Sequence, residues 1–166
     1  MFTDLSIRPA VVADLTAINA IYNWYVPQST CTYQIDPETE EDRRDWFEHH
    51  GPEHPVTVAE LAGEVVGWGS LSTFRARAAY DRTVEDSVYV RHDLQRRGIG
   101  GRLLDDLIAR ATSLGHRVIV AGIDREQAGS IALHEQRGFV QAGLLHEVGF
   151  KFDRWLDMVF MERLLR

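Results

Sequence analysis

The sequence has very little cysteine and very little lysine, and each scarcity narrows its interpretation. Cys31 is the only cysteine, which excludes an internal disulfide and a cysteine-based zinc cluster and makes a reducing cytoplasm the simplest location. Lys151 is the only lysine, so nearly all positive charge is carried by arginine. No apolar run reaches the ~18 residues that a membrane helix requires, and we expect no membrane association.

The acidic excess excludes another class of partner. The chain has 18 Lys and Arg against 25 Asp and Glu, a formal net charge of −7, which argues against a general nucleic-acid binder. The first 74 residues contain 12 of the acids and only 3 of the bases, whereas four arginines and one acid, Asp93, lie between positions 91 and 102. This arginine-rich middle predicts a local site for a small anion.

Hydrophobic periodicity predicts a mixed α/β (α+β) fold. The 166 residues contain no repeat, low-complexity tract or linker, so we expect one domain over residues 1–166. Asp14 is expected to cap the first helix, and Ala62-Gly63 to turn a hairpin. Strands are expected over residues 6–8, 56–61, 65–74, 84–90, 117–123, 139–148 and 155–164, and helices over 15–25, 40–49, 103–114 and 130–136. This order indicates a mixed sheet with helices packed on it.

A glycine-rich turn, Gln95 to Gly101, joins the valine-rich strand to the strongest helix. Glycines let the backbone approach a ligand, and the unpaired N–H groups of the first helical turn attract an anion. The turn lacks the lysine of a nucleoside-triphosphate loop. Leu103 stands where a dinucleotide-binding loop needs a small residue. Both nucleotide classes are therefore disfavoured.

The remaining pattern, Gln/Arg-x-x-Gly-x-Gly/Ala, resembles the pyrophosphate loop of the GNAT superfamily of N-acetyltransferases, which bind acetyl-CoA. Several other segments resemble the phosphinothricin and methionine sulfoximine (or methionine sulfone) acetyltransferase family, in the right order over most of the chain; these segments are residues 22–26, 74–77, 80, 83–90, 130–135, 138–139 and 148–155. The resemblance implies a GNAT fold, with a mixed, mostly antiparallel central sheet, helices on both faces and a splayed central strand.

The resemblance also implies a reaction. Acetyl-CoA, as co-substrate, would donate its acetyl group to the free amino group of a small amino-acid analogue, without a metal, in a detoxifying cytoplasmic homodimer. It implies cofactor contacts at Val88, Tyr89, Val90, Arg96, Arg97, Gly98, Ile99, Gly100, Gly101 and Gln127. Gln127 stands where the family usually has asparagine, so whether it keeps the contact stays open.

An amino group with a pKa of about 8 must lose a proton before it attacks, and a general base meets that need. The resemblance assigns this role to Glu85 and places assistance at His134, which could relay a proton or simply pack in the core. It places substrate contacts at Arg75, Ala76, Arg77, Glu85, Asp86 and Ser87. Arg75 and Arg77 alternate, so they share one face of an extended segment and suit the anionic groups of an amino-acid analogue.

Two alternatives stay open. One keeps the fold but acetylates protein N-termini or ribosomal proteins, which would need an open groove for an extended peptide. The other is a non-catalytic regulator that binds CoA, against which an intact Glu85 and His134 argue. The sequence does not identify the physiological amine or the oligomeric state.

Overall fold

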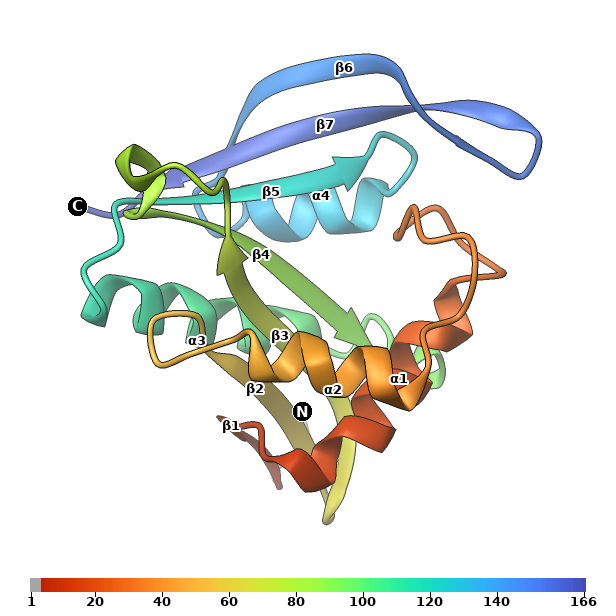
Figure 1. Cartoon of the computed structure of the whole chain (residues 1–166), viewed down its shortest axis with the longest axis vertical. Coiled ribbons are helices and arrows are strands. Elements are labelled where there is room, and N and C mark those ends of the chain that lie inside the picture. The colour runs from red at the N-terminus through yellow and green to blue at the C-terminus, as the bar shows by residue number, and fades with distance from the viewer. Residues whose placement is uncertain (1–3) are drawn as a thin grey trace.

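The computed structural model describes residues 4–166 and contains one seven-stranded sheet with the order β1-β2-β3-β4-β5-β7-β6 (Figure 1). The strands are β1 (Leu5–Pro9), β2 (Val56–Leu61), β3 (Glu64–Thr73), β4 (Thr83–Val90), β5 (Val118–Asp124), β6 (Val140–Lys151) and β7 (Arg154–Leu164). The helices are α1 (Leu15–Tyr25), α2 (Glu40–Glu48), α3 (Ile99–Ser113) and α4 (Ala128–Glu135). Neighbouring strands are antiparallel except for β4 and β5. The predicted fold class and order of elements are confirmed.

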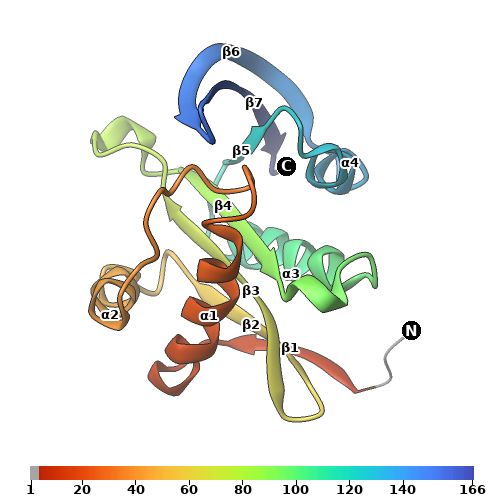
Figure 2. The same ribbon diagram turned by 90° about the vertical axis from the view of Figure 1, so that its right-hand side faces the viewer.

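The helices cover both faces of the sheet, with α1 and α2 on one side and α3 and α4 on the other (Figure 2). On the α3 side, Leu104 and Leu107 pack against Val84, Ile119 and Met161 of the sheet. On the α1 side, the largest cluster joins residues of α1 to β2 and β3; its buried members are Leu15, Ile18, Ile21, Tyr25, Val56, Val58 and Trp68. No helix within residues 4–166 is both long and apolar enough to cross a membrane.

The expected cap at Asp14 is wrong. Residues Val12–Asp14 form a 3-10 turn before α1, so Asp14 is already in a helical conformation (φ −83°, ψ −14°) and makes no side-chain cap to the helix. Its carboxylate instead accepts the backbone N–H of Val11 at 2.8 Å and pairs with Arg8. The predicted turn at Ala62-Gly63 is confirmed, because both residues adopt positive φ between β2 and β3.

The feature that positions the site is a splay between β4 and β5. Their parallel pairing joins Thr83, Val84 and Glu85 to residues 118–120, whereas β3 pairs with β4 as far as Val90. Beyond Glu85, β4 follows β3 and diverges from β5, as Figure 1 shows. The sheet therefore opens near its middle, with the expected splayed central strand.

Candidate active site

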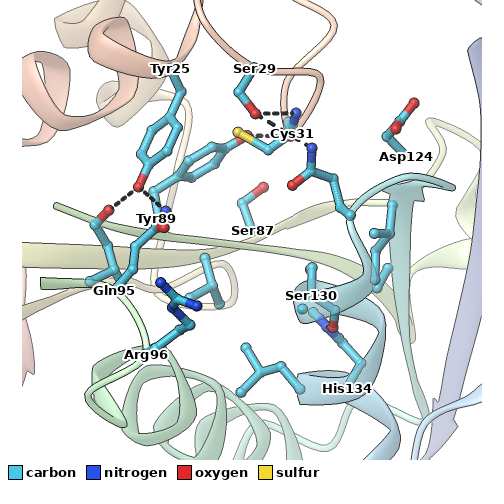
Figure 3. Close-up of a pocket in the computed structure, with 18 of the residues that line it drawn as sticks. Tyr25, Ser29, Cys31, Ser87, Tyr89, Gln95, Arg96, Asp124, Ser130 and His134 are labelled. Carbon is cyan, nitrogen blue, oxygen red and sulfur yellow. Dashed lines mark hydrogen bonds between the residues drawn. The ribbon is translucent and has the colours of Figure 1, made fainter. Parts of the chain in front are cut away.

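A cavity of about 710 Å³ occupies this opening (Figure 3). Its walls come from β4, from the glycine turn, from β5 with the start of α4, and from the end of α1 with the loop that follows it. Of the residues predicted to bind cofactor, those that line the cavity are Val88, Tyr89, Val90, Arg96, Gly98, Ile99, Gly100, Gly101 and Gln127. Arg97 lies outside the lining. The topology thus brings together two segments, the 88–101 stretch and Gln127, that are distant in sequence.

The glycine turn has the geometry of an anion site. Gly98 has φ +84° and precedes α3, whose first i→i+4 bond runs from the amide of Arg102 to the carbonyl of Gly98. The N–H groups of Ile99, Gly100 and Gly101 come before that bond and belong to residues that line the cavity. At Gly101 a Cβ atom would stand 2.2 Å from the guanidinium of Arg137, so a side chain here would displace that guanidinium. The turn therefore suits the pyrophosphate of a CoA ligand.

Two contacts fix the end of α1 against the turn. The hydroxyl of Tyr25 donates to the carbonyl of Val90 at 2.5 Å and accepts from Nε2 of Gln95 at 2.6 Å. Burial raises the pKa of Tyr25 to about 12, so the hydroxyl keeps its proton. The sequence predicts a helix that ends at Tyr25, but it does not predict these contacts, because the partners of Tyr25 are far away in the chain.

The loop between α1 and α2, which carries Ser29 and Cys31 at the cavity (Figure 3), is held in place by buried polar groups. Asp124 accepts from Oγ1 of Thr30 at 3.0 Å and from the hydroxyl of Tyr33 at 2.8 Å. Lys151 is only 4% exposed, and its Nζ donates to the carbonyls of Ser29 and Thr32 at 2.8 Å. These contacts between distant segments had no signal in the sequence.

Gln127 has a second partner in the same loop. Its amide nitrogen donates to Oγ1 of Thr30 at 3.0 Å. The same nitrogen also donates to Oγ of Ser29 at 3.5 Å. The longer side chain thus links the start of α4 to the loop and leaves its carbonyl oxygen for other partners.

Glu85 lies where the splay begins, on the opposite face of β4 from Asp86. Unlike Ser87 and Tyr89 on the same face, it is not part of the cavity lining. A Cβ atom at Gly122, which lines the cavity, would stand 3.3 Å from Oε1 of Glu85, 3.2 Å from Sδ of Met158 and 3.6 Å from the ring of Phe160. Burial, with a smaller effect of the neighbouring Asp86 charge, raises the pKa of Glu85. Its carboxyl group is therefore a stronger base than an ordinary glutamate.

Asp86 faces the opposite side, as strand alternation requires, and contacts His134 of α4. Its Oδ2 lies 3.0 Å from Nε2 of His134, and Nδ1 of His134 lies 2.7 Å from the carbonyl oxygen of Ser130. Burial alone would lower the pKa of His134, but the hydrogen bond and charge of Asp86 outweigh it and the pKa is raised. The side chain of Asp86 is therefore separated from those of Glu85 and Ser87, with which it was predicted to bind substrate.

Arg75, Ala76 and Arg77 lie on the exposed loop between β3 and β4, outside the lining of the cavity. The guanidinium of Arg75 lies 5.2 Å from the ring centroid of Phe74 and 5.9 Å from that of Tyr80. Their predicted contact with substrate stays a prediction. Within residues 4–166, no group of three His, Cys, Asp or Glu side chains could hold a metal ion.

The fold, the splay and the glycine turn together define a GNAT N-acetyltransferase. The model of the acetyltransferase (GNAT) family matches residues 18–139, and the chain belongs to this family. It is an acetyl-CoA-dependent N-acetyltransferase.

The relatives are similar over nearly their whole length. The chain is 43% identical over 159 residues to the L-methionine sulfoximine/L-methionine sulfone acetyltransferase of Pseudomonas aeruginosa, covering 95% of this chain and 92% of that protein. A phosphinothricin acetyltransferase of Sinorhizobium meliloti, solved with acetyl-CoA, has a TM-score of 0.94 at 40% identity, over 98% of this chain and 89% of the other. A ribosomal-protein-alanine N-acetyltransferase of Brucella melitensis also reaches 0.94, at 41% identity over 96% and 99% of the two chains.

Proposed function

We propose that this enzyme acetylates the free amino group of a small amino-acid analogue of the phosphinothricin, methionine sulfoximine or methionine sulfone type. The observation that carries the proposal is a cavity in the splay that has Gly122 in its wall, with Glu85, a carboxyl group of raised pKa, directly against that glycine. The names of the relatives at 40–43% identity support this substrate class.

The residues of the cavity fit acetyl-CoA, which supplies the acetyl group as a thioester. The pyrophosphate would bind the N–H groups at the start of α3 beside Arg96, and the pantetheine arm would follow the backbone of Val88, Tyr89 and Val90. The glycine turn contributes donors without side chains in the way.

Glu85 is the proposed general base. The amine arrives mostly as an ammonium ion and loses one proton to Glu85 before nitrogen attacks the acyl carbon. The C–N bond then forms, and the C–S bond breaks with its electron pair remaining on sulfur. The nitrogen loses a second proton as the amide forms, and sulfur takes one up, so the products are the N-acetyl compound and CoA.

Transfer is proposed to be direct, without an acetylated enzyme. Cys31 lines the cavity and is the one thiol that could compete as a nucleophile. Burial raises its pKa, which keeps it protonated and unreactive. Cys31→Ser should therefore retain activity, and initial rates should fit a ternary-complex mechanism. Direct transfer would be contradicted if the wild type gave parallel double-reciprocal lines, which indicate a ping-pong mechanism, and if Cys31→Ser were inactive.

Arg75 and Arg77 are proposed to bind the anionic groups of the acceptor at the mouth of the site. Changing either to glutamine should raise the KM for the acceptor about tenfold and leave that for acetyl-CoA within about twofold. Arg82→Gln is the matched control, since Arg82 is a third arginine of the same exposed loop. A raised KM for acetyl-CoA instead would place these arginines at the cofactor.

The substrate class is tested by assaying acetyl-CoA consumption with methionine sulfoximine, methionine sulfone, phosphinothricin, methionine and an N-terminal alanine peptide. The proposal expects the amino-acid analogues to react at far higher kcat/KM than the peptide. Reaction of the peptide alone would favour the ribosomal-protein alternative, which the Brucella relative represents. Acetyl-CoA binding in calorimetry without turnover of any amine would favour a regulator.

We also propose a homodimer built on the hairpin of β6 and β7. β6 is the last strand of the sheet, and the hairpin exposes Phe150 and Trp155 (52% and 62%), whose rings pack at 4.9 Å. An edge strand with exposed aromatic groups can pair with its own copy about a two-fold axis. Sedimentation should show a dimer that Trp155→Ser weakens and Val12→Ser, at another exposed apolar site, does not. A monomer at micromolar concentration would contradict the proposed homodimer.

A detoxifying role and a cytoplasmic location stay predictions.

A further inference from the structure

Both ring nitrogens of His134 face oxygen atoms. The Ser130 carbonyl, 2.7 Å from Nδ1, can only accept, so Nδ1 carries hydrogen. Asp86 Oδ2, 3.0 Å from Nε2, also accepts when the carboxyl group is ionised. The Asp86–His134 contact is therefore complete only while one proton lies between Oδ2 and Nε2. If that proton is lost, a nitrogen lone pair faces a carboxylate.

Among the neighbouring charges, that of Asp86 decides the protonation of His134. The side chains of His134 and Asp86 are only 5% and 2% exposed. Phe139 meets the imidazole edge-to-face at 4.9 Å, and the charge of Arg137, itself paired with Asp105, opposes protonation of the ring. Asp86 is the acid whose charge favours the imidazolium, and its other oxygen, Oδ1, is buried without a hydrogen-bond partner among residues 4–166.

The pair also joins two walls of the cavity. Asp86 directly follows Glu85, the last β4 residue in the parallel pairing with β5, so it lies where the splay starts. His134 lies on α4, whose first residues form another part of the lining, and both Asp86 and His134 are among the lining residues. The hydrogen bond between them crosses from β4 to α4.

We propose that Asp86 and His134 form a proton-dependent clamp across the cofactor cavity, so that acetyl-CoA binds tightly while the pair holds its proton and loosely once the proton is lost. His134 is then a positioning residue and not a base, because neither ring nitrogen offers a free lone pair. Loss of the proton would break the link and leave an uncompensated carboxylate on the wall of a cavity that binds an anion. The clamp rests on the proposed placement of acetyl-CoA in this cavity.

Asp86→Asn is a matched variant that keeps a hydrogen bond between residue 86 and His134 but removes the shared proton. An asparagine N–H can donate to Nε2 of a neutral His134 while Nδ1 still donates to Ser130. The geometry survives without a shared proton. Asp86→Ala removes the partner and should weaken acetyl-CoA binding at every pH. Thermal unfolding of both variants checks that the fold is retained.

The experiment measures the Kd of acetyl-CoA from about pH 6.5 to about pH 9. The Cys31 thiol stays protonated over this range, because burial raises its pKa. The wild-type Kd should rise by up to about tenfold per pH unit above the pKa of His134, whereas the Asp86→Asn Kd should change by less than about twofold. Identical pH profiles for the two proteins would overturn the clamp.

Histidine NMR gives a readout that does not depend on turnover. The His134 ring should be protonated at both nitrogens near pH 7 and should titrate at higher pH when acetyl-CoA is bound, since linkage is reciprocal. A neutral ring at pH 7, or a pKa unmoved by acetyl-CoA, would overturn the clamp. If acetyl-CoA does not bind in this cavity, Arg96→Ala will leave its Kd unchanged at every pH. That result distinguishes failure of the proposed placement from failure of the clamp.

Discussion

Glu85 and Gly122 lie against each other where β4 leaves β5, so closely that a Cβ atom on residue 122 would stand 3.3 Å from Oε1 of the glutamate. The same atom would stand 3.2 Å from Sδ of Met158. The carboxyl group therefore lies directly against the backbone of β5, at a glycine of the cavity wall. We propose that the acceptor amine approaches Glu85 past this glycine.

A branched side chain at position 122 should impair catalysis. Gly122→Val is expected to lower kcat at least tenfold, because its methyl groups occupy the proposed position of the amine and displace Glu85. Steady-state kinetics on methionine sulfone measures this. Gly129→Ala is the control, since a Cβ atom there meets nothing within 4 Å on the same cavity. Equal activity of wild type and Gly122→Val would mean that acetyl transfer takes place elsewhere.

Arg96 should contribute to acetyl-CoA affinity. It lines the cavity at the glycine turn, whereas Arg102, one turn along α3, is exposed and lies outside the lining. We expect Arg96→Ala to raise the Kd for acetyl-CoA about tenfold, the value of one charge-assisted contact to a phosphate, and Arg102→Ala to change it by less than about twofold. Calorimetry at fixed salt compares the two, and equal effects would mean a diffuse electrostatic attraction.

Lys151 should stabilise the loop over the cavity. Its ammonium group donates to the carbonyls of Ser29 and Thr32, so Lys151→Met leaves two largely buried acceptors unpaired. The free energy of unfolding should fall by about 2–4 kcal/mol in urea denaturation, and the KM for the acceptor should rise. Arg154→Gln is the control, because it removes an exposed ion pair with Glu126, which contributes little to stability in water. A Lys151→Met protein as stable as the control would contradict this role.

Local patterns foretold much of the fold. The apolar stripe of α3 and the valines of β4 predicted which faces are buried, and the turn residues Ala62-Gly63 predicted a hairpin. The cap at Asp14 was mistaken because a 3-10 turn ahead of α1 gives its carboxylate other partners. One domain remains a prediction.

The candidate site was predicted less completely. The alternation of side chains along β4 already implies that Asp86 and Glu85 face opposite sides of the sheet. By contrast, Lys151 contacts a loop near residue 30, and Gln127 contacts Thr30. Such contacts join segments about a hundred residues apart, and periodicity has no access to them.

The most direct test of the account is the pH dependence of kcat/KM for methionine sulfone in wild type and Glu85→Gln. Glu85 must be ionised to accept a proton, so wild-type activity should be lost as pH falls through the raised pKa of this group. Glu85→Gln should be about 100-fold slower and lack that titration, with acetyl-CoA affinity largely kept. Glu135→Gln, on the exposed end of α4, should behave as wild type. A Glu85→Gln enzyme with the wild-type rate and pH profile would contradict the central claim.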